Sequence, residues 1–100
     1  MTLVSAQPIK APLVLDEDLE VNLGTGYSRT LNAGVTWTNV GHISNGDVYK
    51  TDDQILTIEG SNIYEAYLVV KDDALIGFYL PVERAFSPLH ATLRLPIRTD

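Results

Sequence analysis

The chain has 100 residues, of which 45% are apolar, and seven Lys and Arg oppose thirteen Asp and Glu for a formal charge of −6. This composition predicts one folded globular domain with a modest core. The acidic balance disfavours a nucleic-acid partner, because such binding needs a clustered positive surface. The absence of cysteine excludes disulfides, thiolate metal sites and cysteine nucleophiles.

We expect residues 1–11 to form a loosely ordered N-terminal arm. We expect residues 12–100 to form a single β-barrel domain. The opening stretch MTLVSAQPIKAP lacks a basic segment followed by an apolar core, so we do not expect it to act as a signal peptide. No stretch approaches the ~18 apolar residues that span a bilayer, and we expect no membrane insertion. A native Met1 would favour the cytoplasm, whereas removal of a leader would favour export.

Apolar and polar residues alternate with the period of a β-strand along most of the chain. The first such segment is 19–23, where a brief helical turn over 16–19 stays open as an alternative. Thr, Val, Ile and Tyr supply strand-forming side chains in the later segments. These later segments are 35–38, 56–59, 64–71, 76–80 and 92–98.

Turn signals separate these segments. SNGD (44–47) contains Asn-Gly, which favours a two-residue hairpin turn because both positions accept positive φ. EGSN (59–62) and KDDA (71–74) are spaced to reverse the chain, which predicts a three-stranded meander over 54–80. Pro96 lacks an N–H, so we expect either that the last strand lies at a sheet edge or that Pro96 lies on its solvent-facing side. The fold class predicted is all-β, a small antiparallel barrel, with a compact β-sandwich as the alternative.

One stretch, EAYLVVKDDALIGFYLPVERAFSPL (65–89), resembles the second half of an SH3-like barrel. The resemblance implies a long strand, a short hairpin, a strand reading Gly-x-x-x-Pro and a single 3₁₀ turn near 82–86. Gly77, Pro81 and Phe86 would take these structural roles. The resemblance concerns the fold alone, because the acidic, tyrosine-rich segment of SH3 peptide binders is missing and Trp37 is the only tryptophan.

The residue types needed for catalysis or metal binding do not form a recognisable motif. The sequence contains His42 and His90 but no Gly-x-Ser-x-Gly nucleophile elbow. The acidic pairs Asp52-Asp53 and Asp72-Asp73 do not continue into a calcium-binding loop, and Gly24-x-Gly26 lacks the rest of a dinucleotide fingerprint. We therefore expect no catalytic residue, no metal and no cofactor.

The candidate interaction residues are aromatic and cationic. Tyr67 and Tyr79 fall on the strand face opposite the main apolar set, where a hairpin would bring them together as a contact patch. The alternative is that the barrel buries them as outer-core residues. Arg94 and Arg98 share one face of the last strand and could meet a carboxylate-bearing partner.

These features predict a non-enzymatic protein-interaction or assembly module, which would bind a protein partner or its own copy through an edge strand. One alternative is a small ligand-binding or catalytic barrel that is active as an oligomer, with a pocket lined by His42, Tyr49 or Tyr64. Another is an accessory subunit of a bacterial envelope or mobile-element system.

Overall fold

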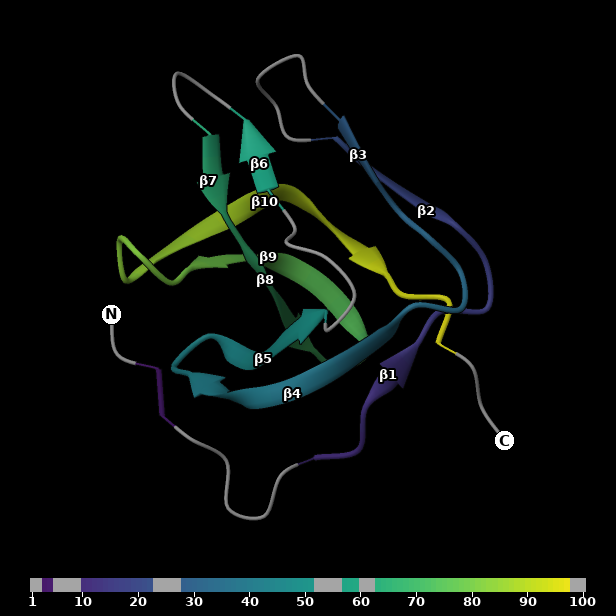
Figure 1. Cartoon of the computed structure of the whole chain (residues 1–100), viewed down its shortest axis with the longest axis horizontal. Coiled ribbons are helices and arrows are strands. Elements are labelled where there is room, and N and C mark those ends of the chain that lie inside the picture. Colours follow the sequence, from purple (N-terminus) through teal and green to yellow (C-terminus); the bar gives the residue numbers. More distant parts are fainter. Residues whose placement is uncertain (1–2, 5–9, 23–27, 52–56, 60–62, 98–100) are drawn as a thin grey trace.

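A computed structural model describes most of the chain. The described residues are 3–4, 10–22, 28–51, 57–59 and 63–97. Among them no helix is long and apolar enough to cross a membrane. The all-β prediction is confirmed, because the described elements are strands joined by turns (Figure 1).

The described residues form ten strands, which follow one another along the chain. Their bounds are β1 (Leu13–Val14), β2 (Leu19–Asn22), β3 (Ser28–Leu31), β4 (Thr36–Ile43), β5 (Gly46–Thr51), β6 (Thr57–Glu59), β7 (Ile63–Glu65), β8 (Tyr67–Lys71), β9 (Ala74–Leu80) and β10 (Ala85–Arg94). Six of them form one antiparallel sheet in the order β1-β4-β5-β8-β9-β10, while β2–β3 and β6–β7 are separate two-stranded sheets. The six-stranded sheet curls into a half-barrel (Figure 1).

The two edges of the curled sheet approach each other at one end. Leu15, just after β1, forms an isolated antiparallel bridge with Ile97, which follows β10. The Asp16 N–H donates to the Pro96 carbonyl at 2.6 Å. These contacts connect the segments that follow the two edge strands, β1 and β10. The half-barrel is therefore partly closed at that end. The last strand lies at an edge of the sheet as predicted, although β10 ends at Arg94 and Pro96, on which the prediction was based, lies outside it.

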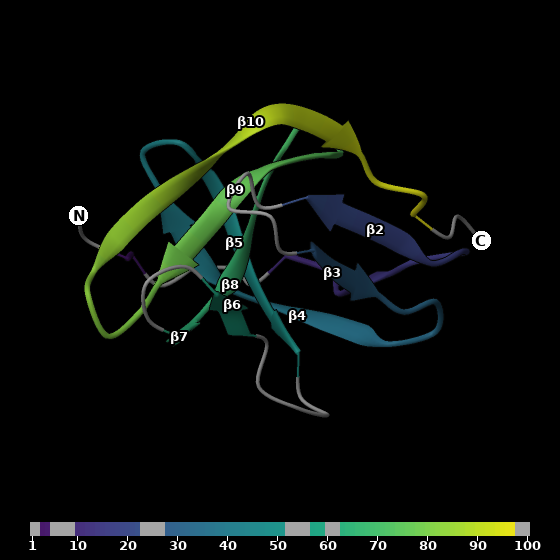
Figure 2. The same ribbon diagram turned by 90° about the horizontal axis from the view of Figure 1, so that it is seen from above.

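The two faces of the sheet carry two separate apolar clusters. The larger one lies inside the curl and includes Trp37, Phe78 and Leu68, with Val21 and Leu31 contributed by the β2–β3 hairpin. Figure 2 shows that hairpin beside the main sheet. The smaller cluster, on the other face, contains Ile43, Val48, Val69 and Tyr79, and Leu3 from the N-terminal segment packs against it. Alternation along β8 supplies both clusters, as the period-two pattern predicts.

The β8–β9 turn is the one that KDDA predicts. Lys71 pairs with Ala74, and the two residues between them have positive φ, 53° at Asp72 and 62° at Asp73. This backbone matches the right-handed twist of the flanking strands, and aspartate tolerates it better than most residues.

The β4–β5 turn differs from the prediction by one residue. Ile43 pairs with Gly46, so the turn residues are Ser44 and Asn45 and not Asn45 and Gly46. Gly46 is required for another reason. A Cβ atom there would lie 2.6 Å from the carbonyl oxygen of Val70, which leaves no room for any larger residue.

The prediction of a 3₁₀ turn near 82–86 is wrong. Leu80 pairs directly with Ala85, so residues 81–84 make a four-residue hairpin turn, and Phe86 already lies in β10. Arg84 closes this turn with a φ of 54°. Pro81 ends β9 because it has no N–H to continue the ladder. The chain therefore returns along β9 instead of crossing to another part of the barrel.

The structural roles expected of Gly77 and Phe86 are connected across this hairpin. A Cβ atom on Gly77 would lie 2.5 Å from the Ser87 carbonyl oxygen and 2.8 Å from the Phe86 ring. The aromatic ring thus covers the glycine of the neighbouring strand, and only glycine permits this packing.

Two further differences concern strand lengths. The segment 64–71 is interrupted at Ala66, which is buried in the larger core, so β7 leaves the main sheet and pairs with β6. β10 begins earlier than the predicted last strand of 92–98, because residues 85–91 also belong to it, and it ends at Arg94. Its pairing with β9 is irregular between Pro88 and Leu93. Residues 1–11 are described only in part, and Val4 bridges His42 of β4.

Candidate functional site

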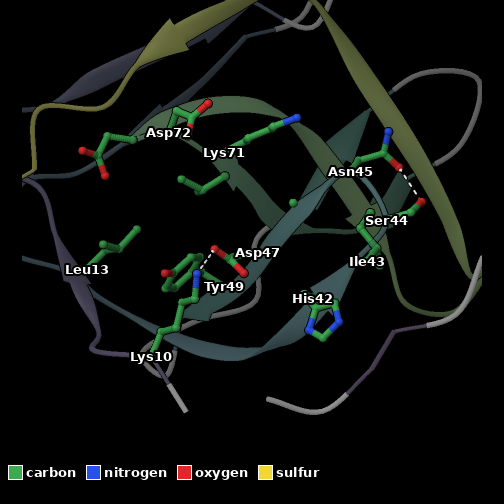
Figure 3. Close-up of a pocket in the computed structure, with 13 residues that line it drawn as sticks. Lys10, Leu13, His42, Ile43, Ser44, Asn45, Asp47, Tyr49, Lys71 and Asp72 are labelled. Atoms are coloured by element: carbon green, nitrogen blue, oxygen red, sulfur yellow. Dashed lines mark hydrogen bonds and ion pairs between the residues drawn. The ribbon is translucent and has the colours of Figure 1, made fainter. Parts of the chain in front are cut away.

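An open pocket of about 490 Å³ lies between two hairpin turns and the segment that precedes β1. The β4–β5 hairpin contributes His42 and Asp47, and the β8–β9 turn contributes Asp72 and Asp73. Lys10 and Leu13 line the side next to β1, and Tyr49 of β5 also lines the pocket (Figure 3). We call this region the Lys10–Asp47 pocket.

An ion pair between the two residues that name it crosses this pocket. The Lys10 ammonium donates to Asp47 Oδ2 at 2.7 Å, although the two residues are 37 positions apart in the sequence. The Lys10 side chain is 59% exposed and that of Asp47 is 30% exposed. The hydrogen bond with Asp47 and the charge of that carboxylate raise the pKa of Lys10. Pairs this exposed are held weakly and are screened by salt.

Tyr49 forms the inner wall of the pocket. Its side chain belongs to the larger core and is only 5% exposed. Burial raises the pKa of its phenol, and the charges of Asp47 and Asp73 raise it further, while Lys10 lowers it. The hydroxyl end of Tyr49 therefore lies in the negative field of two carboxylates, which the Lys10 ammonium partly offsets.

Asn39 positions Lys10 through an irregularity in β4. The pairing of β4 with β5 shifts between Asn39 and Gly41, a β-bulge that Gly41 accommodates with a φ of 145°. The buried Asn39 amide donates to the carbonyl oxygens of Gly41 at 3.1 Å and Val48 at 3.2 Å. Its Oδ1 accepts from the Lys10 backbone N–H at 3.4 Å. One side chain thus completes the bulge and anchors the segment that carries Lys10.

The structure brings the two predicted contact tyrosines together. Tyr67 and Tyr79 are direct cross-strand partners, and their ring centroids are 6.4 Å apart with an interplanar angle of 37°. Tyr79, however, is only 3% exposed and belongs to the smaller core, against which the half-buried Tyr67 packs. Of the two readings that the sequence left open, outer-core packing therefore describes Tyr79, which presents no surface for a partner.

The second predicted pair is described only in part. Arg94 is exposed at the end of β10, where it lines an open hollow of about 330 Å³ with Glu17 and Asp18. Arg98 lies outside the described residues. The carboxylates around Arg94 already supply the negative charge that a carboxylate-bearing partner would offer, so this region is not a simple cationic patch.

Two of the three residues expected in an oligomeric pocket meet within one chain. His42 and Tyr49 both line the Lys10–Asp47 pocket. Tyr64 lies on β7, in a separate two-stranded sheet. No set of three or more His, Asp or Glu side chains within the described residues is placed to hold a metal ion.

The sequence reasoning missed Lys10, Asp47 and Asn39. The sequence pattern places Lys10 in a loosely ordered arm and Asp47 in a turn. The sequence does indicate the bulge, because Gly41 is an isolated glycine within a strand pattern, two residues after Asn39. Such a glycine is typical of a β-bulge. No local signal pairs Lys10 with Asp47, since only the folded sheet brings them together.

The fold and the pocket define a small all-β half-barrel domain with an open polar site at one end of its sheet. Comparison with protein-family models, curated proteins and solved structures found no match to the chain. The geometry of this chain is therefore the basis of the function proposed below.

Proposed function

We propose that the protein is a non-enzymatic protein-interaction module that binds an extended segment of its partner along β10. The observation that carries this proposal is the position of β10. It is the outermost strand of the six-stranded sheet, ten residues long. None of its residues whose exposure is described is buried. An open strand edge offers backbone groups that a partner strand can pair with.

The direction of the backbone groups in β10 follows from Pro88 and Gly77. The Ser87 carbonyl lies close to Gly77, so it points toward β9. Backbone groups of successive strand residues point to alternate sides. The N–H and C=O of Phe86 therefore point to the open side, as does the nitrogen of Pro88, which has no hydrogen to donate.

This arrangement limits how a partner can pair. Phe86 offers one N–H and one C=O, and Pro88 offers a C=O only. The irregular pairing between Pro88 and Leu93 then interrupts the strand. An edge with so few outward-pointing groups favours pairing with a short partner segment and disfavours open-ended aggregation.

The likeness of residues 65–89 to an SH3-like barrel forms part of the proposal. The three consecutive antiparallel strands β8, β9 and β10 at one side of the curled sheet support it. The four-residue turn between β9 and β10 departs from that pattern.

Affinity capture from native lysate tests the proposal with two substitutions at one position. Phe86→Ala removes the ring but keeps the outward N–H, whereas Phe86→Pro removes both. We expect the Phe86→Ala variant to retain a partner that the Phe86→Pro variant loses, with circular dichroism showing that both are folded. A partner retained equally by both variants would rule out pairing at this edge.

A further inference from the structure

Phe86 connects the open edge of β10 with the smaller apolar cluster. Its backbone N–H and C=O point to the open side, whereas its side chain packs against the cluster. Tyr79, a buried member of that cluster, is its direct cross-strand partner on β9. A segment that pairs with Phe86 therefore lies along the border of the smaller cluster.

The Phe86 ring leans away from the open side. A Cβ atom on Gly77 of β9 would lie 2.8 Å from Phe86 Cε1 and 2.9 Å from Cζ, so the ring extends over the neighbouring strand. Phe86 nevertheless stays half-buried. In the described part of the chain, no strand pairs with the outer side of β10. The part of the ring that remains exposed can therefore contact a side chain of an added strand.

The border of the cluster at β4 shows which kind of residue covers such a position. There, Val4 forms an isolated antiparallel bridge with His42, with backbone hydrogen bonds of 2.9 and 2.8 Å. Leu3, the residue before Val4, packs against the smaller cluster. An extended segment thus already places one apolar side chain on this cluster at the β4 border. Among the described strands, none does the same at the β10 border.

The neighbouring positions of β10 select a partner less strongly. Ala85 and Ser87 pair with two residues of the larger core, so they lie on the other face of the sheet. Their short side chains offer little surface for a partner residue to contact. The requirement for an apolar side chain therefore falls on the single partner position opposite Phe86.

We propose that the partner segment carries a β-branched apolar residue, valine or isoleucine, directly opposite Phe86, and that this residue extends the smaller cluster by one strand. The inference rests on the proposed edge pairing along β10. Opposite residues of an antiparallel pair have Cβ atoms about 4.5–5.5 Å apart, and pairs of an aromatic with a β-branched residue stabilise sheets. The two neighbours of this residue in the partner segment can be polar.

The test is a nitrogen–proton NMR titration of the full chain with four short peptides. The valine peptide is acetyl-Lys-Thr-Val-Thr-Lys-amide, and the serine peptide replaces its valine with serine at equal charge. Two further peptides are valine peptides with an N-methyl group, either on the valine or on the threonine that follows it. N-methylation of the valine removes the N–H that would donate to the Phe86 carbonyl, whereas the N–H of that threonine would point away from β10.

We expect the valine peptide to shift the amide signals of Phe86 and its neighbours in β10. It should bind roughly three- to tenfold more tightly than the serine peptide, the range for half-burial of a valine side chain. The peptide with N-methylvaline should bind more weakly than the valine peptide, and the peptide with N-methylthreonine should bind equally well. These comparisons use the unaltered chain, so they do not depend on the folding of any variant.

A substitution then assigns the preference to the Phe86 ring. Phe86→Ala should weaken the valine peptide without abolishing its binding, and should make the valine and serine peptides equivalent. Val82→Ala is the matched control, because Val82 is apolar but lies in the β9–β10 turn and is 75% exposed. It should leave the preference for valine unchanged.

The outcomes separate this inference from the edge pairing on which it rests. Equal affinity for the valine and serine peptides, with weaker binding of the N-methylvaline peptide, would overturn the inference and leave the edge pairing intact. A preference for valine that survives Phe86→Ala would also overturn it. Binding that is indifferent to N-methylation of the valine, or no shift at Phe86 with any peptide, would contradict the edge pairing and this inference together.

Discussion

Asn39 provides the most informative stability test, because one buried side chain completes the bulge that positions Lys10. It is only 2% exposed and donates to the carbonyl oxygens of Gly41 and Val48. Asn39→Ala removes both donors and leaves those carbonyls buried among apolar neighbours. Each lost hydrogen bond costs about 0.5–1.5 kcal/mol, and more where the remaining partner stays buried and unpaired.

The expected loss in the free energy of unfolding is therefore about 2–3 kcal/mol. For a domain of this size, each kcal/mol lowers Tm by roughly 4–8 °C, so Tm should fall by about 10–20 °C. Urea unfolding followed by the fluorescence of the buried Trp37 measures the change directly. Asn22→Ala, on the exposed face of β2, is the control and should change stability by less than about 0.5 kcal/mol.

Asn39→Asp sharpens the test, because it keeps the shape and replaces the amide donor with an oxygen. At neutral pH a carboxylate oxygen would face two carbonyl oxygens, so we expect a loss at least as large as for alanine. The folded state then disfavours ionisation, which raises the carboxyl pKa above its unfolded value near 3.9. The penalty should shrink as pH falls through the folded pKa. If Asn39→Ala costs no more than Asn22→Ala, the role assigned to the bulge is wrong.

Other positions give simpler predictions. Gly77→Ala should lower the free energy of unfolding by about 1–3 kcal/mol through overpacking. Part of that loss should be recovered in a Phe86→Ala background, because the ring contact is then absent. An equal loss in both backgrounds would contradict the packing described. Phe78→Ala, at 2% exposure in the larger core, should cost about 3–5 kcal/mol in urea unfolding. Burial raises the pKa of Tyr49 above 10.0, so its contribution is present below that pH and is lost as pH rises through the folded pKa. Tyr49→Phe should therefore flatten the decline in stability above pH ~10, and an identical decline in both proteins would refute this.

Local patterns in the sequence predicted much of this fold because they reflect local physics. Alternation placed the residues of β8 on two faces, and the Asp72-Asp73 pair marked its turn because aspartate tolerates positive φ. The Asn45-Gly46 pair predicted the turn one residue too far along the chain. Glycine is required at position 46 by the close approach of the Val70 carbonyl and not by the turn. Tertiary packing overrode the local preference there.

The functional site depends on contacts that local patterns do not record. Lys10 and Asp47 meet only because the segment before β1 runs beside the β4–β5 hairpin. The extent of β10 was also not evident from the sequence, because Pro88 interrupts the usual strand pattern although proline is compatible with an edge strand. Tyr79 alternates like a surface residue, yet the second apolar cluster covers it.

Amide hydrogen exchange at Phe86, in the free chain and in the complex with a captured partner, tests edge pairing most directly. In the free chain the Phe86 amide should exchange rapidly while the neighbouring Ser87 amide, directed at β9, is protected. In the complex the Phe86 amide should become protected as well. A Phe86 amide already protected in the free chain, or one that still exchanges rapidly in the complex, would contradict the proposal that β10 receives the partner.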